Sequence, residues 1–229
     1  MYYMRLIISL LIPAIAALLL LAGVQLAPKI PVCLHSNSFA NNLLRYQLYA
    51  MVVALAAAAT TYFLYPAGRH LLSTGQLGTI ADKETWLGIN GRTTWTRNGV
   101  QLLLSISAAT SVFMFLAVKY THNSGNFAWS VMPLVLVLAC TNALSEELIF
   151  RYSIAGSLWG IYSKTTVLIA SAILFGLPHY YGNPSGLVGV VMSGMLGYIL
   201  CKATIETKGI AVAWAIHFVQ DVIIFTALM

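Results

Sequence analysis

The sequence predicts an all-α membrane protein, a polytopic bundle of about seven transmembrane helices that forms one domain over 1–229. Of the 229 residues, 59% are hydrophobic and only 8% are charged, whereas soluble domains carry about 25% charged residues. The mean hydropathy is +0.83. The chain also contains apolar runs near the ~20 residues that a helix needs to cross a bilayer. These runs lie at 4–26, 47–66, 99–119, 130–157, 164–180, 186–201 and 209–228.

The first apolar run, 4–26, is expected to be a membrane anchor. Its apolar core is longer than the roughly 7–15 residues of a signal peptide, and "AGVQLAPK" is a poor cleavage site. The long hydrophilic connection, 66–98, is rich in Gly, Thr and Asn, which argues against a continuous helix. Its Trp86 and Trp95 are expected to lie in the headgroup layer of the inner membrane face.

The distribution of Lys and Arg predicts the orientation of the bundle. With the N-terminus inside, inner segments carry nine of these residues and outer segments three, or eight against three without Arg151, which is expected within the membrane. The inner set is Arg5, Arg69, Lys83, Arg92, Arg97, Arg151, Lys164, Lys202 and Lys208, and the outer set is Lys29, Arg45 and Lys119. The positive-inside rule therefore predicts a cytoplasmic N-terminus and an outside C-terminus. A short chain without appended domains favours a prokaryotic inner (plasma) membrane. The net charge of +6 suits contact with the lipid bilayer, and no aromatic-interleaved basic cluster indicates nucleic acid.

Ionisable side chains inside the predicted spans are the strongest functional signal. Three of the six acids, Glu146, Glu147 and Asp221, fall in these spans, together with His179 and His217. Each charge near the bilayer centre costs at least ~2.5–3.5 kcal/mol on insertion scales, so several charges on separate helices are expected to converge. Counted from the expected helix ends at 1.5 Å per residue, the four residues other than Glu147 lie roughly 12–22 Å deep, near mid-membrane.

Local spacing suggests how these side chains divide their tasks. Glu147 and Arg151 are four residues apart and can form an ion pair on one helix face. Glu146 is rotated by about 100° from Glu147 and is free to face elsewhere. A carboxylate opposed by two imidazoles can activate a water as general base or help to bind a metal. The same four-residue spacing recurs in Phe175 with His179 and in His217 with Asp221.

Three short motifs resemble the signatures of CPBP-family intramembrane proteases, the group that contains type II CAAX prenyl endopeptidases and Abi or bacteriocin-processing relatives. "EELIFR" at 146–151 fits EExxxR, "FGLPH" at 175–179 fits FxxxH, and "HFVQD" at 217–221 is similar to HxxxN. The motifs occur in the family's order on separate apolar segments, and the resemblance covers about 130–225, the expected catalytic core. It implies an intramembrane endopeptidase that cleaves a membrane-associated protein or peptide near its C-terminus.

The resemblance also implies catalytic roles. Glu146 would be the general base that activates the attacking water, and His179 would help to hold that water. His217 and Asp221 would face the scissile carbonyl and stabilise the oxyanion. Family members are described both as metal-independent glutamic proteases, which need no cofactor, and as metalloproteases. In the second case the candidate zinc ligands are Glu146, His179, His217 and Asp221.

Supporting residues and one departure complete the resemblance. Glu147 and Arg151 would form a supporting ion pair, and Phe175 is expected mainly to pack. Asp221 stands where the family more often has Asn, and an ionised Asp can only accept a hydrogen bond. Asp221 would therefore stay protonated, ligate a metal, or orient and charge His217, and the last role is preferred.

Two other function classes remain open on the residues alone. Glu, His and Asp within helices also build proton relays, so a proton-coupled membrane transporter is one alternative. Against it, the polar residues crowd into the C-terminal half and the expected spans show no halved symmetry, whereas many transporters contain paired repeats. The other alternative is a non-catalytic membrane scaffold that keeps the same fold.

Overall fold

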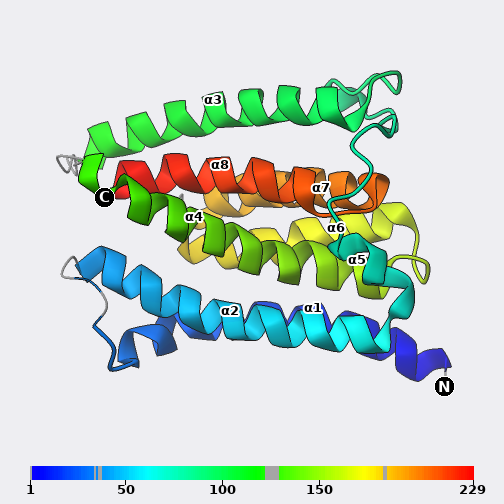
Figure 1. The fold of residues 1–229 in the computed structure, drawn as a ribbon, viewed down its shortest axis with the longest axis horizontal. Helices are drawn as coiled ribbons and strands as arrows, with labels where there is room; N and C mark the ends of the chain where they lie inside the picture. The colour runs from blue at the N-terminus through cyan, green and yellow to red at the C-terminus, as the bar shows by residue number, and fades with distance from the viewer. Residues whose placement is uncertain (1, 34, 36–37, 122–128, 183–184) are drawn as a thin grey trace.

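The computed structural model describes residues 2–33, 35, 38–121, 129–182 and 185–229, and over these residues the chain is helical, without a β-strand (Figure 1). The α-helices are α1 (Tyr2–Leu26), α2 (Ser38–Leu64), α3 (Trp95–Thr121), α4 (Met132–Glu147), α5 (Ile154–Leu158), α6 (Lys164–Gly176), α7 (Gly186–Thr207) and α8 (Ala211–Leu228). A π-helix spans Leu148–Ser153, and 3-10 helices span Ala27–Lys29, Pro66–Leu72, Thr85–Leu87, Trp129–Val131 and Leu177–Tyr181. The prediction of an all-α membrane bundle is confirmed.

Six segments of the described chain are long and apolar enough to cross a membrane. They are Ile7–Lys29, Ala40–Leu64, Trp95–Tyr120, Trp129–Leu158, Gly186–Thr207 and Ala211–Leu228. The expected span at 164–180 is not among them, because α6 has 13 residues, about 20 Å at 1.5 Å per residue. α6 nevertheless packs along α7. α1 begins at one end of the bundle and α8 ends at the other (Figure 1). Which end faces the cytoplasm stays a prediction.

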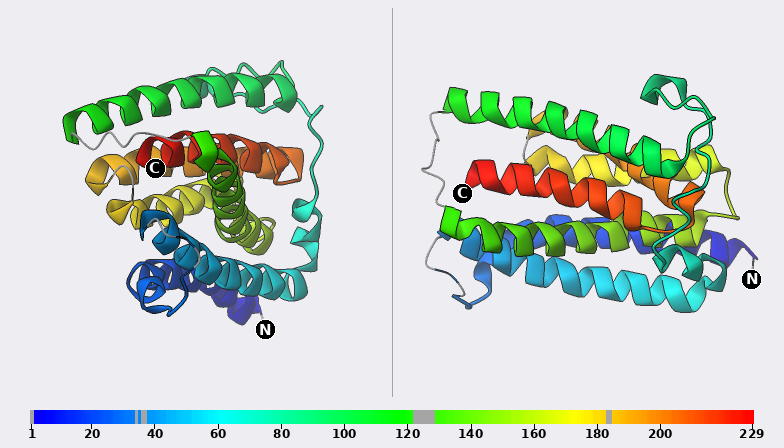
Figure 2. Two further views of the ribbon diagram at one scale, coloured as in Figure 1. Left: turned by 60° about the vertical axis from the view of Figure 1, so that its left-hand side comes forward. Right: turned by 45° about the horizontal axis from the view of Figure 1, so that its top comes forward.

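Helices α4 and α8 form the centre of the bundle (Figure 2). α4 packs against α2 and α8, while α3 covers α8 and α1 lies against α2. In the most apolar window of each span, 56% of the residues are buried for the span that contains α4, against 17% for the span formed by α3. The segment that carries the EExxxR motif is therefore the most buried of the six spans, while the span of α8, which carries the HxxxN motif, is 33% buried.

The segment that follows α4 is not the continuous α-helix expected over 130–157. α4 ends at Glu147, the π-helix follows, and α5 continues to Leu158. The hydroxyl of Ser153 donates to the carbonyl oxygen of Leu148, five residues earlier, at 2.9 Å. Every residue of the π-helix is buried. Short π segments inside α-helices are frequent at functional sites, and this one begins directly after the Glu146–Glu147 pair.

Small residues let α6 and α7 approach closely. A side chain at Gly176 would lie 2.6 Å from the carbonyl oxygen of Val190, and one at Gly197 would lie 3.1 Å from that of Ser171. Such contacts favour glycine because a Cβ atom has no room. Pro178 follows α6 in the 3-10 helix Leu177–Tyr181. The α-helix therefore stops before His179 and turns the histidine towards the bundle centre.

A group of charged residues, named here the end cluster, ties the 66–94 connection to α6 and α7. It consists of Asp82, Glu84, Lys164, Lys202 and Glu206. The indole nitrogen of Trp95 donates to Glu206 at 2.9 Å, and the Trp95 side chain is fully buried. The expectation that Trp95 lies in the headgroup layer is therefore wrong, because its indole pairs with a carboxylate that faces the bundle interior. Trp86 is 52% exposed.

Candidate active site

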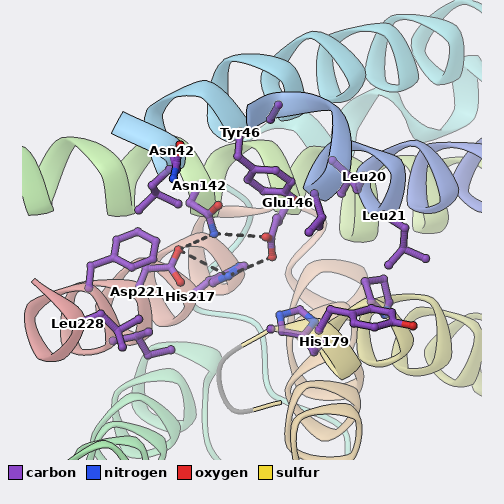
Figure 3. Close-up of a pocket in the computed structure, with 18 of the residues that line it drawn as sticks. Leu20, Leu21, Asn42, Tyr46, Asn142, Glu146, His179, His217, Asp221 and Leu228 are labelled. Carbon is purple, nitrogen blue, oxygen red and sulfur yellow. Dashed lines mark hydrogen bonds and ion pairs between the residues drawn. The ribbon is translucent and has the colours of Figure 1, made fainter. Parts of the chain in front are cut away.

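The four residues predicted for catalysis line one cavity of about 410 Å³ (Figure 3). Glu146 comes from the last turn of α4, and His217 and Asp221 come from α8. His179 reaches the cavity from the 3-10 helix that follows α6. Segments that are up to 75 residues apart in the chain are thus brought together where α4, α8 and the end of α6 meet.

Glu147 and Arg151 form the predicted ion pair behind the cavity. The Arg151 Nε atom lies 3.2 Å from Glu147 Oε2, and both side chains are completely buried. The guanidinium carbon lies 4.1 Å from the centroid of the Phe175 ring, in cation–π geometry. No guanidinium nitrogen of Arg151 has a hydrogen bond among the described residues. The charge is therefore held by one carboxylate and one aromatic face, and Phe175 packs against it as expected.

His217 lies between the buried ion pair and the cavity. Its Nδ1 atom is 2.8 Å from Glu147 Oε1, while its Nε2 atom is 3.5 Å from Glu146 Oε2 and 3.7 Å from Asp221 Oδ2. A carboxylate oxygen accepts here, so Nδ1 carries a hydrogen and Nε2 is the ring atom that faces the cavity. The hydrogen bond that orients the ring comes from Glu147. The sequence analysis preferred Asp221 as the residue that orients His217. In the structure Glu147 makes the orienting hydrogen bond, whereas Asp221 lies beyond hydrogen-bond distance.

Asn142 is a member of the site that the motif analysis missed. Its amide nitrogen lies 3.3 Å from Glu146 Oε1 and 3.1 Å from Asp221 Oδ2, so one amide group bridges the two carboxylates (Figure 3). It precedes Glu146 by four residues and therefore shares its helix face. That spacing, for an amide inside an apolar run, was the available signal. The family more often has an Asn, and so an amide group, at position 221. In this chain the amide of Asn142 lies next to Asp221 instead.

His179 is oriented by the main chain. Its Nδ1 atom is 2.7 Å from the carbonyl oxygen of Phe175, four residues earlier. Because a carbonyl oxygen can only accept, Nδ1 carries the hydrogen and Nε2 keeps its lone pair. The Phe175 and His179 rings also lie in contact, 4.7 Å between centroids. His179 therefore offers a hydrogen-bond acceptor near Glu146.

The four candidate metal ligands do not form a ligand cluster in this arrangement. Among the described residues, no group of three or more His, Cys, Asp or Glu side chains is placed to hold one metal ion. The Nδ1 atoms of both histidines are hydrogen-bonded, one to Glu147 and one to a main-chain oxygen, which leaves both Nε2 atoms free as a metal ligand would require. The geometry does not fit a preassembled zinc site, so no step is derived from one. Metal dependence stays a prediction.

The remainder of the cavity is mostly apolar. Its walls extend towards the end of the bundle where α1 ends, α2 begins and α8 ends. The lining residues on these helices include Leu20, Leu21, Val24, Leu43, Tyr46, Phe225 and Leu228. A wide apolar cavity with a few converging polar groups is the usual form of a ligand site. It suits a substrate segment that enters from the membrane.

The comparison with protein families agrees with the geometry of the site. Residues 127–223 match the family model described as Type II CAAX prenyl endopeptidase Rce1-like. Comparisons with curated proteins and with solved structures gave no match. The matched range includes α4, most of α8 and every residue of the three motifs, so the family resemblance predicted from the sequence is confirmed. Over 127–223 this chain is similar to Rce1-like type II CAAX prenyl endopeptidases, and that similarity supports an integral membrane protease of the CAAX type.

Proposed function

We propose that the protein is an intramembrane endopeptidase that hydrolyses a peptide bond near the C-terminus of a membrane-associated protein or peptide, with a water activated by Glu146. One observation carries the proposal. Glu146 Oε2 and Glu147 Oε2 are both buried without a hydrogen bond among the described residues. Glu147 Oε2 lies 3.2 Å from Arg151 Nε, whereas Glu146 Oε2 belongs to a residue that lines the cavity and lies 3.5 Å from His217 Nε2. A buried carboxylate oxygen without a donor is costly for structure alone. It suits a general base that receives a proton from water.

The proposed reaction follows the positions of three side chains. Glu146 Oε2 takes a proton from the water, which also donates to His179 Nε2. The resulting hydroxide bonds to the scissile carbonyl carbon, and the electron pair of the C=O bond moves to oxygen. His217 Nε2–H donates to this oxyanion. Collapse of the intermediate breaks the C–N bond, and Glu146 returns its proton to the leaving nitrogen. One water is consumed, and a carboxylic acid and an amine are formed.

Glu147 and Arg151 support the reaction through His217. Glu147 fixes the ring by accepting from Nδ1, and it favours a positive charge on the imidazole when Nε2 faces an oxyanion. Arg151 offsets the charge of Glu147, so that His217 can become a protonated hydrogen-bond donor in a low-dielectric setting. The Asn142 amide donates to Glu146 Oε1 and to Asp221 Oδ2, which leaves Glu146 Oε2 free to face His217 Nε2. Asp221 then contributes negative charge near Nε2 and need not orient the ring.

The membrane setting completes the proposal. We keep the predicted orientation, with a cytoplasmic N-terminus and an outside C-terminus in a prokaryotic inner membrane. The apolar walls of the cavity then lie in the outer half of the bilayer, because they face the end where α8 finishes. The partners proposed are a membrane-bound peptide segment and the lipid bilayer, without nucleic acid.

The test is cleavage of a panel of C-terminal peptides by purified protein in liposomes. We expect Glu146→Gln to lower kcat/KM by about 10²–10⁴-fold, the usual contribution of a general base. The matched control is Glu84→Gln, the same chemical change in the end cluster, which should retain cleavage. Cleavage that survives Glu146→Gln would overturn the proposal. Proton-coupled flux without any cleavage would favour a transporter.

A chelator arm decides the metal question within the same assay. Cleavage that persists in a strong chelator would indicate a water activated by the glutamate alone. Cleavage that is lost, and is restored by zinc but not by magnesium, would indicate a metalloprotease whose ligands rearrange around the ion. Both readouts use the wild-type protein, so neither depends on the folding of a variant.

A further inference from the structure

A second, smaller cavity lies on the other side of the α8 residues of the site. Its volume is about 100 Å³, and it lies between α3, α7, α8 and the 3-10 helix that follows α6. His179, His217 and Asp221 line both cavities, whereas Glu146 lines only the first. The polar groups of the site thus form a partition between two spaces. The proposed function assigns a role only to the first of them.

Gln220 shows that the second cavity is suited to a polar ligand. Its Nε2 atom donates to Ser107 Oγ at 2.9 Å and to the carbonyl oxygen of Ile216 at 3.3 Å. Because the Ile216 oxygen can only accept, the amide cannot be turned round without loss of that bond. Its Oε1 atom is therefore left as an acceptor, buried and without a hydrogen bond among the described residues. The Gln220 side chain lines the second cavity and is only 3% exposed.

The size and lining of the cavity fit water. At about 30 Å³ of liquid volume per molecule, the space holds roughly three waters. A buried water needs two to four polar partners, and the wall offers the Gln220 oxygen, the Asp221 carboxylate and the hydroxyls of Thr110 and Ser193. Apart from these groups and the two histidines, the lining is apolar. An organic ligand larger than a few atoms has no room there.

A hydrolase whose substrate cavity is apolar needs a route by which water reaches the scissile bond. The second cavity would provide that route. Each turnover consumes one water, and a substrate that fills the first cavity excludes water from that side. A store of water behind His179 and His217 can deliver the next molecule to the scissile bond while the substrate stays bound. Thr110, on the little-buried helix α3, is only partly buried and lies at the outer wall. It therefore separates the cavity from the lipid that surrounds α3.

We propose that the second cavity, between α3, α7 and α8, is a water-binding site that supplies the hydrolytic water from the side opposite the substrate. The role of supplying the hydrolytic water rests on the proposed function. The presence of water there is independent of that function, and the two can be tested separately.

The presence of water is tested by radiolytic hydroxyl-radical footprinting of the full-length protein in lipid nanodiscs, read by mass spectrometry. Met114 lines the second cavity and is only 4% exposed, whereas Met195 is 50% exposed on the outer surface of α7 and does not line it. Radicals form from water, so we expect Met114 to oxidise faster than Met195, which faces lipid. Oxidation of Met114 that is no faster than that of Met195 would overturn the proposal.

Variants tie the labelling to the cavity. Gln220→Leu removes the free acceptor, and Thr110→Leu fills the space from a helix that tolerates change. Each should lower Met114 oxidation about fivefold, the equilibrium effect of one hydrogen bond. The matched control is Gln47→Leu, because Gln47 is also buried in a span but bonds to Leu138 and Thr141 away from the cavity. Labelling that is unchanged in both cavity variants would contradict the assignment.

Kinetics test the supply role. In the protein that cleaves peptide, both cavity variants should lower kcat about fivefold, with KM unchanged, because a bound water precedes the chemical step. An increase in KM at constant kcat would assign the cavity to a substrate side chain and overturn the proposal. If the wild type labels as expected but cleaves no peptide, the water site stands and the protease proposal fails.

Discussion

The six acids of the chain form two groups of three that differ in how their charges are balanced. In the end cluster, each carboxylate lies within 4 Å of an ammonium group. Glu206 alone meets Lys164 at 2.6 Å and Lys202 at 2.5 Å. In the other group Glu146 and Asp221 line the cavity and Glu147 lies behind it, and the three carboxylates share one guanidinium and one imidazole. The oxygen Glu146 Oε2 has no hydrogen-bond donor among the described residues.

The difference separates structural charge from chemical charge. A buried charge that serves only the fold is matched by partners, because an unmatched one is costly. The end cluster meets that condition and connects a loop to two helices. The cavity group does not meet it, and its surplus of acceptors faces an open space. Charge balance therefore identifies the reactive group better than burial does, since both groups contain fully buried members.

The largest effect on stability and cleavage is expected at Arg151, the cation that balances the charge of Glu147. Arg151→Leu leaves Glu147 buried without its cation, which should lower the free energy of unfolding by about 3–5 kcal/mol and abolish cleavage. The measurement is thermal unfolding in detergent, followed by a peptide assay on the folded fraction. The matched control is Arg69→Leu, because Arg69 also lies over an aromatic ring, that of Tyr62, but is exposed. It should cost only about 0.5–1 kcal/mol. Equal losses in the two variants would show that the comparison is wrong.

A smaller effect is expected in the end cluster. Lys202→Met removes one of the two ammonium groups on Glu206, which keeps Lys164 and the Trp95 indole. We expect the free energy of unfolding to fall by about 1.5–3 kcal/mol, the value of a hydrogen bond to a charged group. Cleavage per folded molecule should stay at the wild-type level. A loss of kcat in fully folded Lys202→Met would mean that the end cluster is coupled to the site.

The smallest effect is expected at the exposed edge of the end cluster. Asp82 pairs with Lys164 but its side chain is 70% exposed, so Asp82→Asn should cost at most about 1 kcal/mol. The hydrogen bond from Lys164 lowers the pKa of the Asp82 carboxyl, against a smaller opposite effect of partial burial. The contribution is therefore complete above the ordinary value of 3.8 and is lost as the pH falls through the lowered pKa. Melting temperatures of the two proteins should converge below that range. A difference that stays constant with pH would rule out the pair.

The fold class and the convergence of the site followed from composition and from the placement of a few charges. Apolar runs predict helices in a bilayer, and a charge within such a run needs a partner from another helix. That reasoning placed Glu146, His179, His217 and Asp221 together before any coordinates. It holds because the cost of an isolated charge in hydrocarbon leaves few other arrangements.

Other features depend on the three-dimensional arrangement. Which carboxylate orients His217 depends on a rotation of α4 against α8 that no single-helix pattern specifies, and the sequence analysis considered only Asp221 for that role. Asn142 was missed because a lone amide in an apolar run costs far less than a charge and so carries a weaker signal. Trp95 was misplaced because its partner, Glu206, lies 111 residues away in the chain. The short length of α6 reflects its packing against α7 rather than its hydropathy.

The π-helix at Leu148–Ser153 has a further consequence for how this chain can change. An extra residue inside a helix turns everything after it by about 100° relative to an uninterrupted α-helix. Residue spacing counted from α4 therefore does not predict which face of α5 packs on α1, because the count is shifted by one residue across the π-helix. Substitutions in this stretch alter contacts, but a one-residue deletion between Glu147 and Arg151 would turn Arg151 by about 100° about the helix axis relative to Glu147, while leaving the composition almost untouched. In this segment residue count is a stricter constraint than residue identity.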